Sequence, residues 1–314
     1  MEIIEFDGKY IYQIIDLWNQ ELHADTMNVD TFSALVLGDV NFNKNLFLLA
    51  VKEEKLLGFI WAVKRRYPYL ERGLEPHRGY IVSQAVNKEY QNQGIATALL
   101  KKVESQMKAE GTEEVTLGAY SPNYLFPGVD KNNYTNAISF YSNQGYISKG
   151  KAVSMNQTLI DYTYPEAVLK QKQKLEQQGY KFLKFDYKDS TELLDFLITN
   201  FGSGWMSNVK ESLKRMDAPE TLIICRNKED EIVGYCQRAI DGHPDRFGPF
   251  GVDESLRGLG LGSVLFNEML HDMTKRGIHH VYFLWTGGRA QLMYERQGMS
   301  AYREYELMRK MLNE

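Results

Sequence analysis

A glycine-rich turn occurs twice in this chain, each time between a short apolar run and a segment with helical spacing. The later copy reads Arg257-Gly258-Leu259-Gly260-Leu261-Gly262 and follows the apolar residues 247–252. The earlier copy reads Gln91-Asn92-Gln93-Gly94-Ile95-Ala96 and follows residues 79–86. Both are typical of a strand, a tight turn and the start of a helix. Glycine has no Cβ, so the backbone N–H groups at such a helix start are open to an anionic ligand.

The features around the two turns recur in the same order, which indicates a tandem duplication. Gly111 and Gly277 end the two helices at equal distances from Gly94 and Gly260. A predicted hairpin precedes each turn, and the spacing changes only where the first half carries a longer polar and aromatic loop, residues 119–133. The resulting prediction is one domain at residues 1–155, a linker helix at 156–179 and a second domain at 180–314.

Composition limits the partners that we expect. Lysines and arginines number 37 against 41 aspartates and glutamates, a formal net charge of -4. That balance gives no basic excess to meet phosphates, so we expect no nucleic-acid partner. No run of about 18 apolar residues occurs, and residues 1–6 lack the features of a signal peptide, so we expect a cytoplasmic protein without a membrane partner. The two cysteines, Cys225 and Cys236, are expected to be reduced core residues.

Other ligands of glycine-rich turns fit the pattern less well. A dinucleotide fingerprint, G-x-G-x-x-G, requires a third glycine where this chain has Ser263. A Walker loop requires Gly-Lys followed by Ser or Thr, and the sequence does not contain it. The neighbours His279 and His280 would point to opposite faces of a strand, so we expect no metal site. A purely structural glycine turn stays the alternative to an anion site.

The two motifs of the chain together resemble the GCN5-related N-acetyltransferases (GNAT). Their acetyl-CoA signature, Arg/Gln-x-x-Gly-x-Gly/Ala, matches residues 91–96 and 257–262. Their C-terminal motif, an alanine followed by a tyrosine and then a glycine, resembles residues 137–146 and 290–299. The resemblance covers both halves, as in the tandem architecture of mycothiol synthase. It implies an α/β (α+β) fold: two tandem GNAT folds, each a mixed, mostly antiparallel sheet flanked by helices.

The resemblance also implies that acetyl-CoA binds at the two turns. Gln91 or Arg257 would order the turn, and the amide of Val86 or Val252 would pair with the pantetheine arm. The amide two residues earlier, in Gln84 or Phe250, would polarise the thioester carbonyl. The N–H groups implied for the pyrophosphate are those of Gln93, Gly94, Ala96 and Thr97 in the first half, and of Leu259, Gly260, Gly262 and Ser263 in the second.

Tyr141 and Tyr294 occupy the family's position for the acid that protonates the departing CoA thiolate. A tyrosine with an ordinary pKa of about 10 is protonated at neutral pH and can donate. The alternative is a helix tyrosine packed in the core. The asparagine that many members carry upstream is replaced here by Tyr134 and Gly287. No general base follows from the sequence, because its candidates are more often solvated loop residues: Glu75, His77, Asp241, His243 and Asp245.

The functional hypothesis is an acyltransferase that uses acetyl-CoA and no metal. It would transfer an acetyl group by direct attack of a primary amine on a small molecule or peptide. We expect at least one active half and favour the second, because its glycine motif is complete and carries Arg257. Two alternatives stay open: one half is a CoA-binding structural or sensing module, or the donor is another acyl-CoA. The acceptor and the oligomeric state do not follow from the sequence.

Overall fold

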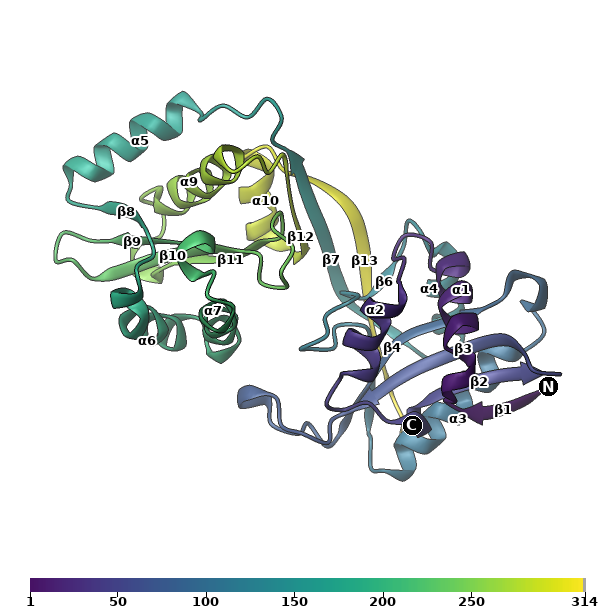
Figure 1. Cartoon of the computed structure of the whole chain (residues 1–314). Helices are drawn as coiled ribbons and strands as arrows, with labels where there is room; N and C mark the ends of the chain where they lie inside the picture. Colours follow the sequence, from purple (N-terminus) through teal and green to yellow (C-terminus); the bar gives the residue numbers. More distant parts are fainter. Residues whose placement is uncertain (313–314) are drawn as a thin grey trace. The chain divides into compact units, whose positions relative to one another are not determined.

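The computed structural model describes residues 1–312, and these divide into two compact units. The first unit holds Met1–Val153 and also the chain from Arg303 onward, whereas the second holds Ser154–Tyr302 (Figure 1). The last strand of the chain therefore belongs largely to the first unit. This division describes packing. The domain boundaries given above describe the repeats in the sequence, and they stay a prediction.

The sheet of the first unit has the strand order β1-β2-β3-β4-β5-β13-β7. It is antiparallel at the pairs β1–β2, β2–β3, β3–β4 and β5–β13, whereas β4 and β5 are parallel. A short strand, β6, pairs with β13. The strands are β1 (Glu2–Glu5), β2 (Phe47–Lys52), β3 (Lys55–Lys64), β4 (Arg78–Val86), β5 (Glu114–Leu117), β6 (Val129–Asp130), β7 (Ile147–Thr158) and β13 (Ser300–Met311).

Helices cover both faces of this sheet, as Figure 1 shows. On one face α1 (Ile11–Glu21) and α2 (Val29–Phe32) bury an aromatic core, in which the rings of Trp18 and Phe59 stack 5.7 Å apart. On the other face α3 (Ile95–Ala109) and α4 (Thr135–Asn143) bury an aliphatic core. The buried positions of α3 recur three or four residues apart, the spacing that places them on one side of a helix.

The second unit repeats this plan around the sheet order β11-β10-β9-β8. One face packs against α6 and α7, and the other against α9, which α5 covers in turn (Figure 1). The elements are α5 (Glu166–Gln177), β8 (Lys181–Lys184), α6 (Ser190–Asn200), α7 (Ser203–Arg215), α8 (Ala218–Thr221), β9 (Leu222–Arg226), β10 (Ile232–Arg238), β11 (Phe247–Val252), α9 (Leu261–Lys275), β12 (His280–Thr286) and α10 (Gly288–Arg296).

These sheets and helices confirm the predicted fold class, a mixed and mostly antiparallel sheet flanked by helices in each half. Among the helices of residues 1–312, none combines the length and the apolar character that a membrane span requires.

The central strands of each unit separate several residues before the glycine turn. β4 and β5 pair from Arg78↔Glu114 to Ile81↔Leu117, and β4 then continues to Val86 along β3. In the second unit, Arg246 and Tyr282 form a parallel bridge just before β11, which then pairs with β10. The last residues of β4 and β11 are therefore edges that face the space beside each turn.

β13 is seated in the first unit by a close backbone approach. Tyr305 pairs with Asp130 and Glu306 with Val129. A Cβ added to Gly128 would lie 2.6 Å from the carbonyl oxygen of Glu306, so any other residue would push the strand away. The sequence accommodates its last strand by leaving this position without a side chain.

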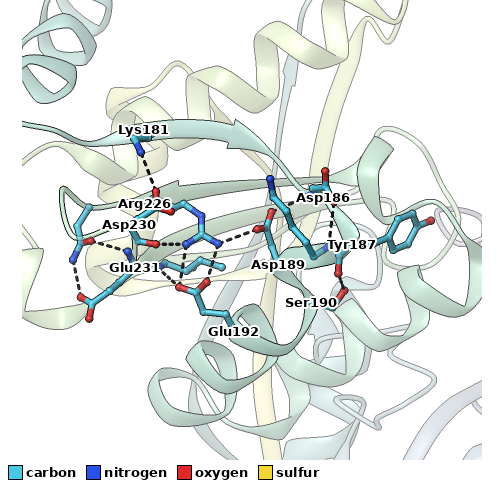
Figure 2. A network of polar contacts seen from close by, with 12 residues as sticks. Lys181, Asp186, Tyr187, Asp189, Ser190, Glu192, Arg226, Asp230 and Glu231 are labelled. Atoms are coloured by element: carbon cyan, nitrogen blue, oxygen red, sulfur yellow. Dashed lines mark hydrogen bonds and ion pairs between the residues drawn. The ribbon is translucent and has the colours of Figure 1, made fainter.

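A buried ion-pair network fixes α6 against β9 in the second unit (Figure 2). The Arg226 guanidinium at the end of β9 donates to Asp189 at 2.9 Å and to Glu192 at 2.8 Å, and also to the carbonyl of Asp230. Asp189 is 5% exposed, so its charge depends on this partner. Glu192 also accepts the N–H of Ile232, which ties the helix to β10.

Arg226→Met should therefore destabilise the second unit. Removing one partner of a buried pair costs about 3–5 kcal/mol, and we expect the low end because Glu192 is partly exposed. Urea unfolding would measure the change. Lys181→Met is the matched control, because Lys181 pairs with Asp230 at the surface of the same network. Equal stability of the two variants would contradict a dominant role for Arg226.

Candidate active site

The first glycine turn presents unpaired backbone N–H groups to an open space. Gly94 has the left-handed conformation, with φ of 82°, and starts α3. The first bond of the helix runs from Ala98 N–H to the Gly94 carbonyl, so the N–H groups of Ala96 and Thr97 have no partner within the helix. A Cβ built on Gly94 would meet no atom within 4 Å among the described residues. The turn therefore has a defined backbone conformation and open space beside Gly94, as an anion site requires.

A hydrogen-bonded pair, Gln84 and Tyr141, stands next to this turn. The Tyr141 hydroxyl on α4 donates to Gln84 Oε1 at 2.8 Å, and Gln84 Nε2 donates to the Ala96 carbonyl at 2.8 Å. Burial, and secondarily the Glu104 carboxylate, raises the pKa of Tyr141 above its usual value. The hydroxyl is therefore protonated at neutral pH and oriented by the strand that it faces.

Two cavities meet at this pair. One, of about 670 Å³, runs along the glycine turn and includes Gln91, Gly94, Ala96 and Thr97. The other, of about 310 Å³, lies on the side of α1 and the 119–133 loop. Both volumes fall in the range of small-molecule sites. The two cavities adjoin, because they share seven lining residues: Gln84, Ala85, Val86, Gln91, Asn136, Ala137 and Tyr141.

The wall of the smaller cavity depends on an arginine that sequence reasoning missed. Arg303 of β13 donates to both oxygens of Asp25, at 2.6 and 2.7 Å, and to Asp130 at 2.5 Å. Tyr134, which replaces the family's asparagine, donates its hydroxyl to Asp25 at 2.7 Å. Arg303 follows the last predicted motif by only a few residues, and the one local signal for it is a charged residue inside a strand-like run.

The electrostatics of Asp130 follow from its setting. Its side chain is buried, which opposes ionisation, but hydrogen bonds from Asn133 and Arg303 outweigh this and hold the pKa of Asp130 below its usual range. Burial also works against the charge of Arg303, yet Asp25 and Asp130 raise its pKa. Asp130 and Arg303 therefore both carry their charges at neutral pH.

The second glycine turn has the same backbone but is covered. Gly260 has φ of 90°, and the first bond of α9 runs from Val264 N–H to its carbonyl. Gln171 of the linker helix α5 donates to the Leu259 carbonyl at 2.6 Å. A Cβ on Gly260 would lie 3.0 Å from the Gln171 side chain. The linker helix thus lies on the surface that is open in the first half.

The aromatic environment of the second tyrosine differs as well. Phe250 occupies the position of Gln84, and its ring lies 5.7 Å from that of Tyr294. Phe283 lies 4.5 Å from the same ring, and Phe247 and Phe266 complete the cluster. Burial raises the pKa of Tyr294. The polar pair of the first half is replaced here by packed rings.

The remaining residues predicted for the second half are placed as follows. Arg257 is exposed and pairs with Glu254 at 2.6 Å, whereas Gln91 donates to the Val86 carbonyl at 2.9 Å and so orders its turn. Ser263 accepts a hydrogen bond from Gln297. Gly262 lies near Phe250, since a Cβ there would be 3.5 Å from its ring, and 3.9 Å from the side chain of Val252. Of the residues predicted for the first half, Gln93 does not line the larger cavity.

The comparisons with known proteins identify the family of both halves. A sequence model of the acetyltransferase (GNAT) family matches residues 9–146 and 190–299. The chain belongs to this family. It is therefore an acyltransferase, and the GNAT fold generally binds acetyl-CoA. The two matched segments confirm the predicted tandem organisation.

Solved structures with the same fold include other GNAT proteins. A glucosamine N-acetyltransferase region of a fungal multi-domain GH3 β-N-acetylglucosaminidase has a TM-score of 0.78 and 18% identity, and the match covers 98% of this chain and 38% of that one. A GNAT protein from Sphaerobacter thermophilus has a TM-score of 0.69 and 18% identity, with 99% and 95% covered. A tandem GNAT protein of clavulanic acid biosynthesis has a TM-score of 0.63 and 11% identity, with 99% and 98% covered.

The present chain therefore spans well under half of the fungal protein but nearly all of the other two. At identities this low, the structural similarity shows a shared fold alone. Among curated proteins, none matches the GNAT chain in sequence.

Arg303→Met should destabilise the first unit of this GNAT protein. The variant leaves the Asp130 carboxylate buried with one partner fewer, which costs about 3–5 kcal/mol at neutral pH. The depressed pKa of Asp130 contributes stability that is present above its unfolded value of about 3.9 and is lost as the pH falls through the folded value. The difference from wild type should thus be largest at neutral pH and shrink in acid.

Urea unfolding at several pH values would measure this difference. Arg309→Met is the control, because Arg309 lies on the same strand and makes a longer, half-exposed pair with Glu114. A pH-independent difference would contradict the assignment of the effect to the Asp130 charge.

Proposed function

We propose that this protein transfers an acetyl group from acetyl-CoA to a primary amine, and that the first half carries out the chemistry. The single observation that carries the proposal is the contrast between the two halves. Gly94 and the pair Gln84–Tyr141 line adjoining cavities, whereas Gly260 is covered by Gln171. The sequence alone favoured the second half as the active one, because its glycine motif is complete. This proposal assigns the chemistry to the first half instead. In this proposal the second half is a structural module.

The residues of the first half fit the parts of acetyl-CoA. The N–H groups from Gln93 to Thr97 would hold the pyrophosphate at the positive end of α3, a term of about 0.3–1 kcal/mol at an exposed site. The edge of β4 at Val86 is free of β5 and would pair with the pantetheine arm. The cofactor supplies an activated acetyl group, and the protein supplies its placement.

The chemistry of the first half would rest on Gln84 and Tyr141. The Gln84 amide N–H would polarise the thioester carbonyl, and removing such a donor costs about 10²–10³ in rate. Because the pKa of Tyr141 is raised, complete transfer of its proton to a thiolate is uphill. Its hydroxyl would instead turn from Gln84 to the sulfur, stabilise the leaving group by a hydrogen bond, and pass on a proton from the attacking nitrogen.

CoA should bind at a single site per chain, and substitution of Gly94 should remove it. Gly94→Asp places a negative charge at the turn in a conformation that Asp tolerates, so we expect CoA affinity to fall by about tenfold or more. Gly260→Asp is the matched control, since the backbone there is the same but Gln171 covers the turn. Calorimetric titration with CoA would give stoichiometry and affinity. Loss of binding in Gly260→Asp alone would contradict the assignment to the first half.

Wild-type protein should release CoA thiol from acetyl-CoA in the presence of a primary amine, and Tyr141→Phe should slow this release. The neighbour whose name specifies glucosamine makes aminosugars the first members of the amine panel. A lost proton donor lowers the rate by about 10²–10⁴-fold. A thiol reagent would follow the reaction, and Tyr294→Phe, with its ring among phenylalanines, should stay near wild type. If the wild-type protein releases no CoA thiol with any amine of the panel, the proposed function is wrong.

A further inference from the structure

The charged residues that line the smaller cavity of the first half are both acidic. Glu21 at the end of α1 and Asp130 in β6 line it, and no lysine, arginine or histidine stands among the described residues of its wall. The other polar groups are neutral: Ser83, Gln84, Gln91, Asn133, Tyr134, Thr135, Asn136 and Tyr141. A molecule that enters this space meets carboxylates, amides and hydroxyls.

Asp130 has no acceptor capacity left for a ligand. Its Oδ1 accepts the backbone N–H groups of Asn132 at 2.8 Å and Asn133 at 3.0 Å. Its Oδ2 accepts the Asn133 side chain at 2.7 Å and Arg303 at 2.5 Å. Four bonds use the four acceptor positions of a carboxylate. Asp130 therefore shapes the wall and is neutralised by Arg303.

Glu21 is held in place but retains free capacity. Its Oε1 accepts the Lys88 N–H at 2.8 Å, and its Oε2 accepts Gln91 Nε2 at 3.1 Å. Each oxygen therefore has one acceptor position left. Within residues 1–312, no lysine, arginine or histidine lies within ion-pair distance of this carboxylate. It is a negative charge with a fixed orientation and room for one ammonium group.

The position of Glu21 links the two parts of the site. Its partner Gln91 also donates to the carbonyl of Val86, at the end of the β4 edge. Glu21, Val86 and Gln91 line the same cavity as Gln84 and Tyr141. An amine bound to Glu21 would thus lie in the cavity that adjoins the proposed acetyl-CoA groove at Gln84 and Tyr141.

We propose that Glu21 binds the ammonium group of the acceptor and takes its proton, and that the site selects amines without a carboxylate next to the amine. This inference rests on the proposed function of the first half. The described lining offers no cation to a substrate carboxylate, which would instead approach the unpaired charge of Glu21 and be repelled. Amino acids with free α-carboxylates should be poor acceptors, and aminosugars and simple amines better ones.

The proton and electron balance of the step is as follows. Glu21 accepts one proton from the ammonium and later releases it to water. The neutral nitrogen forms a bond to the thioester carbon, and the carbon–sulfur bond then breaks with its electron pair on sulfur. The second proton of the nitrogen reaches that sulfur by way of Tyr141. The products are the amide, CoA thiol and one proton, and nothing is oxidised or reduced.

The experiment compares Glu21→Gln with wild type, using acetyl-CoA and four acceptors: glucosamine, tyramine, tyrosine and 4-aminophenol. With glucosamine and tyramine, which are protonated at neutral pH, kcat should fall by about 10²–10⁴-fold. With 4-aminophenol, whose amine is already neutral, the loss should be at least about tenfold smaller. Wild type should use tyramine at least about tenfold better than tyrosine, which differs by one carboxylate.

Calorimetry with CoA separates this role from a structural one. CoA affinity of Glu21→Gln should stay within a few-fold of wild type, because Gln retains an acceptor for Lys88 N–H. Glu89→Gln is the control, since Glu89 lies in the same turn and its carboxylate pairs with Lys55 at the surface. Equal losses for all amines, a loss of CoA binding that accounts for the rate, or tyrosine used as well as tyramine would overturn the inference. Absence of thiol release in wild type would instead remove the proposed function, and this inference with it.

Discussion

The first unit depends on a strand that arrives from the far end of the chain. β13 pairs with β5 and β6, and Gly128 allows its backbone to approach. Three cations of this strand meet acidic partners in the first unit: Arg303, Arg309 and Lys310. Arg303 matters most, because it is buried and joins the α1–α2 connection to the loop that walls the smaller cavity. The first half therefore cannot acquire its complete site until the whole chain has been made.

The two halves have the same backbone at the turn, as a duplication predicts, and they differ in the side chains around it. Gly94 and Gly260 start their helices with nearly the same φ. The differences lie in residues that face the turn, since Gln84 is replaced by Phe250 and open space by Gln171. The glycine motif reflects the backbone conformation that the turn needs. What fills the space beside the turn depends on segments far away in the sequence.

This explains what could be predicted and what could not. The spacing of apolar residues predicted the strands before the two turns, and the predicted ranges 79–86 and 247–252 agree closely with β4 and β11. The glycines and tyrosines that face each turn were found because their conformation or chemistry restricts the residue type. Glu21, Gln171 and Arg303 were missed, because each acts through a partner more than 60 residues away. No local periodicity reports such a pairing.

The second half shows that a complete glycine motif does not determine what fills the space beside the turn. Two separate features fill that space, the linker helix over the turn and the phenylalanine rings around Tyr294. They lie on different elements and act on different parts of a CoA molecule. Moving α5 would expose the Gly260 N–H groups but would leave Tyr294 without the polar partner that Gln84 gives Tyr141. The glycines can persist in such a half for a reason unrelated to CoA, because Gly260 needs its left-handed conformation to start α9, and α9 packs on β9 and β10.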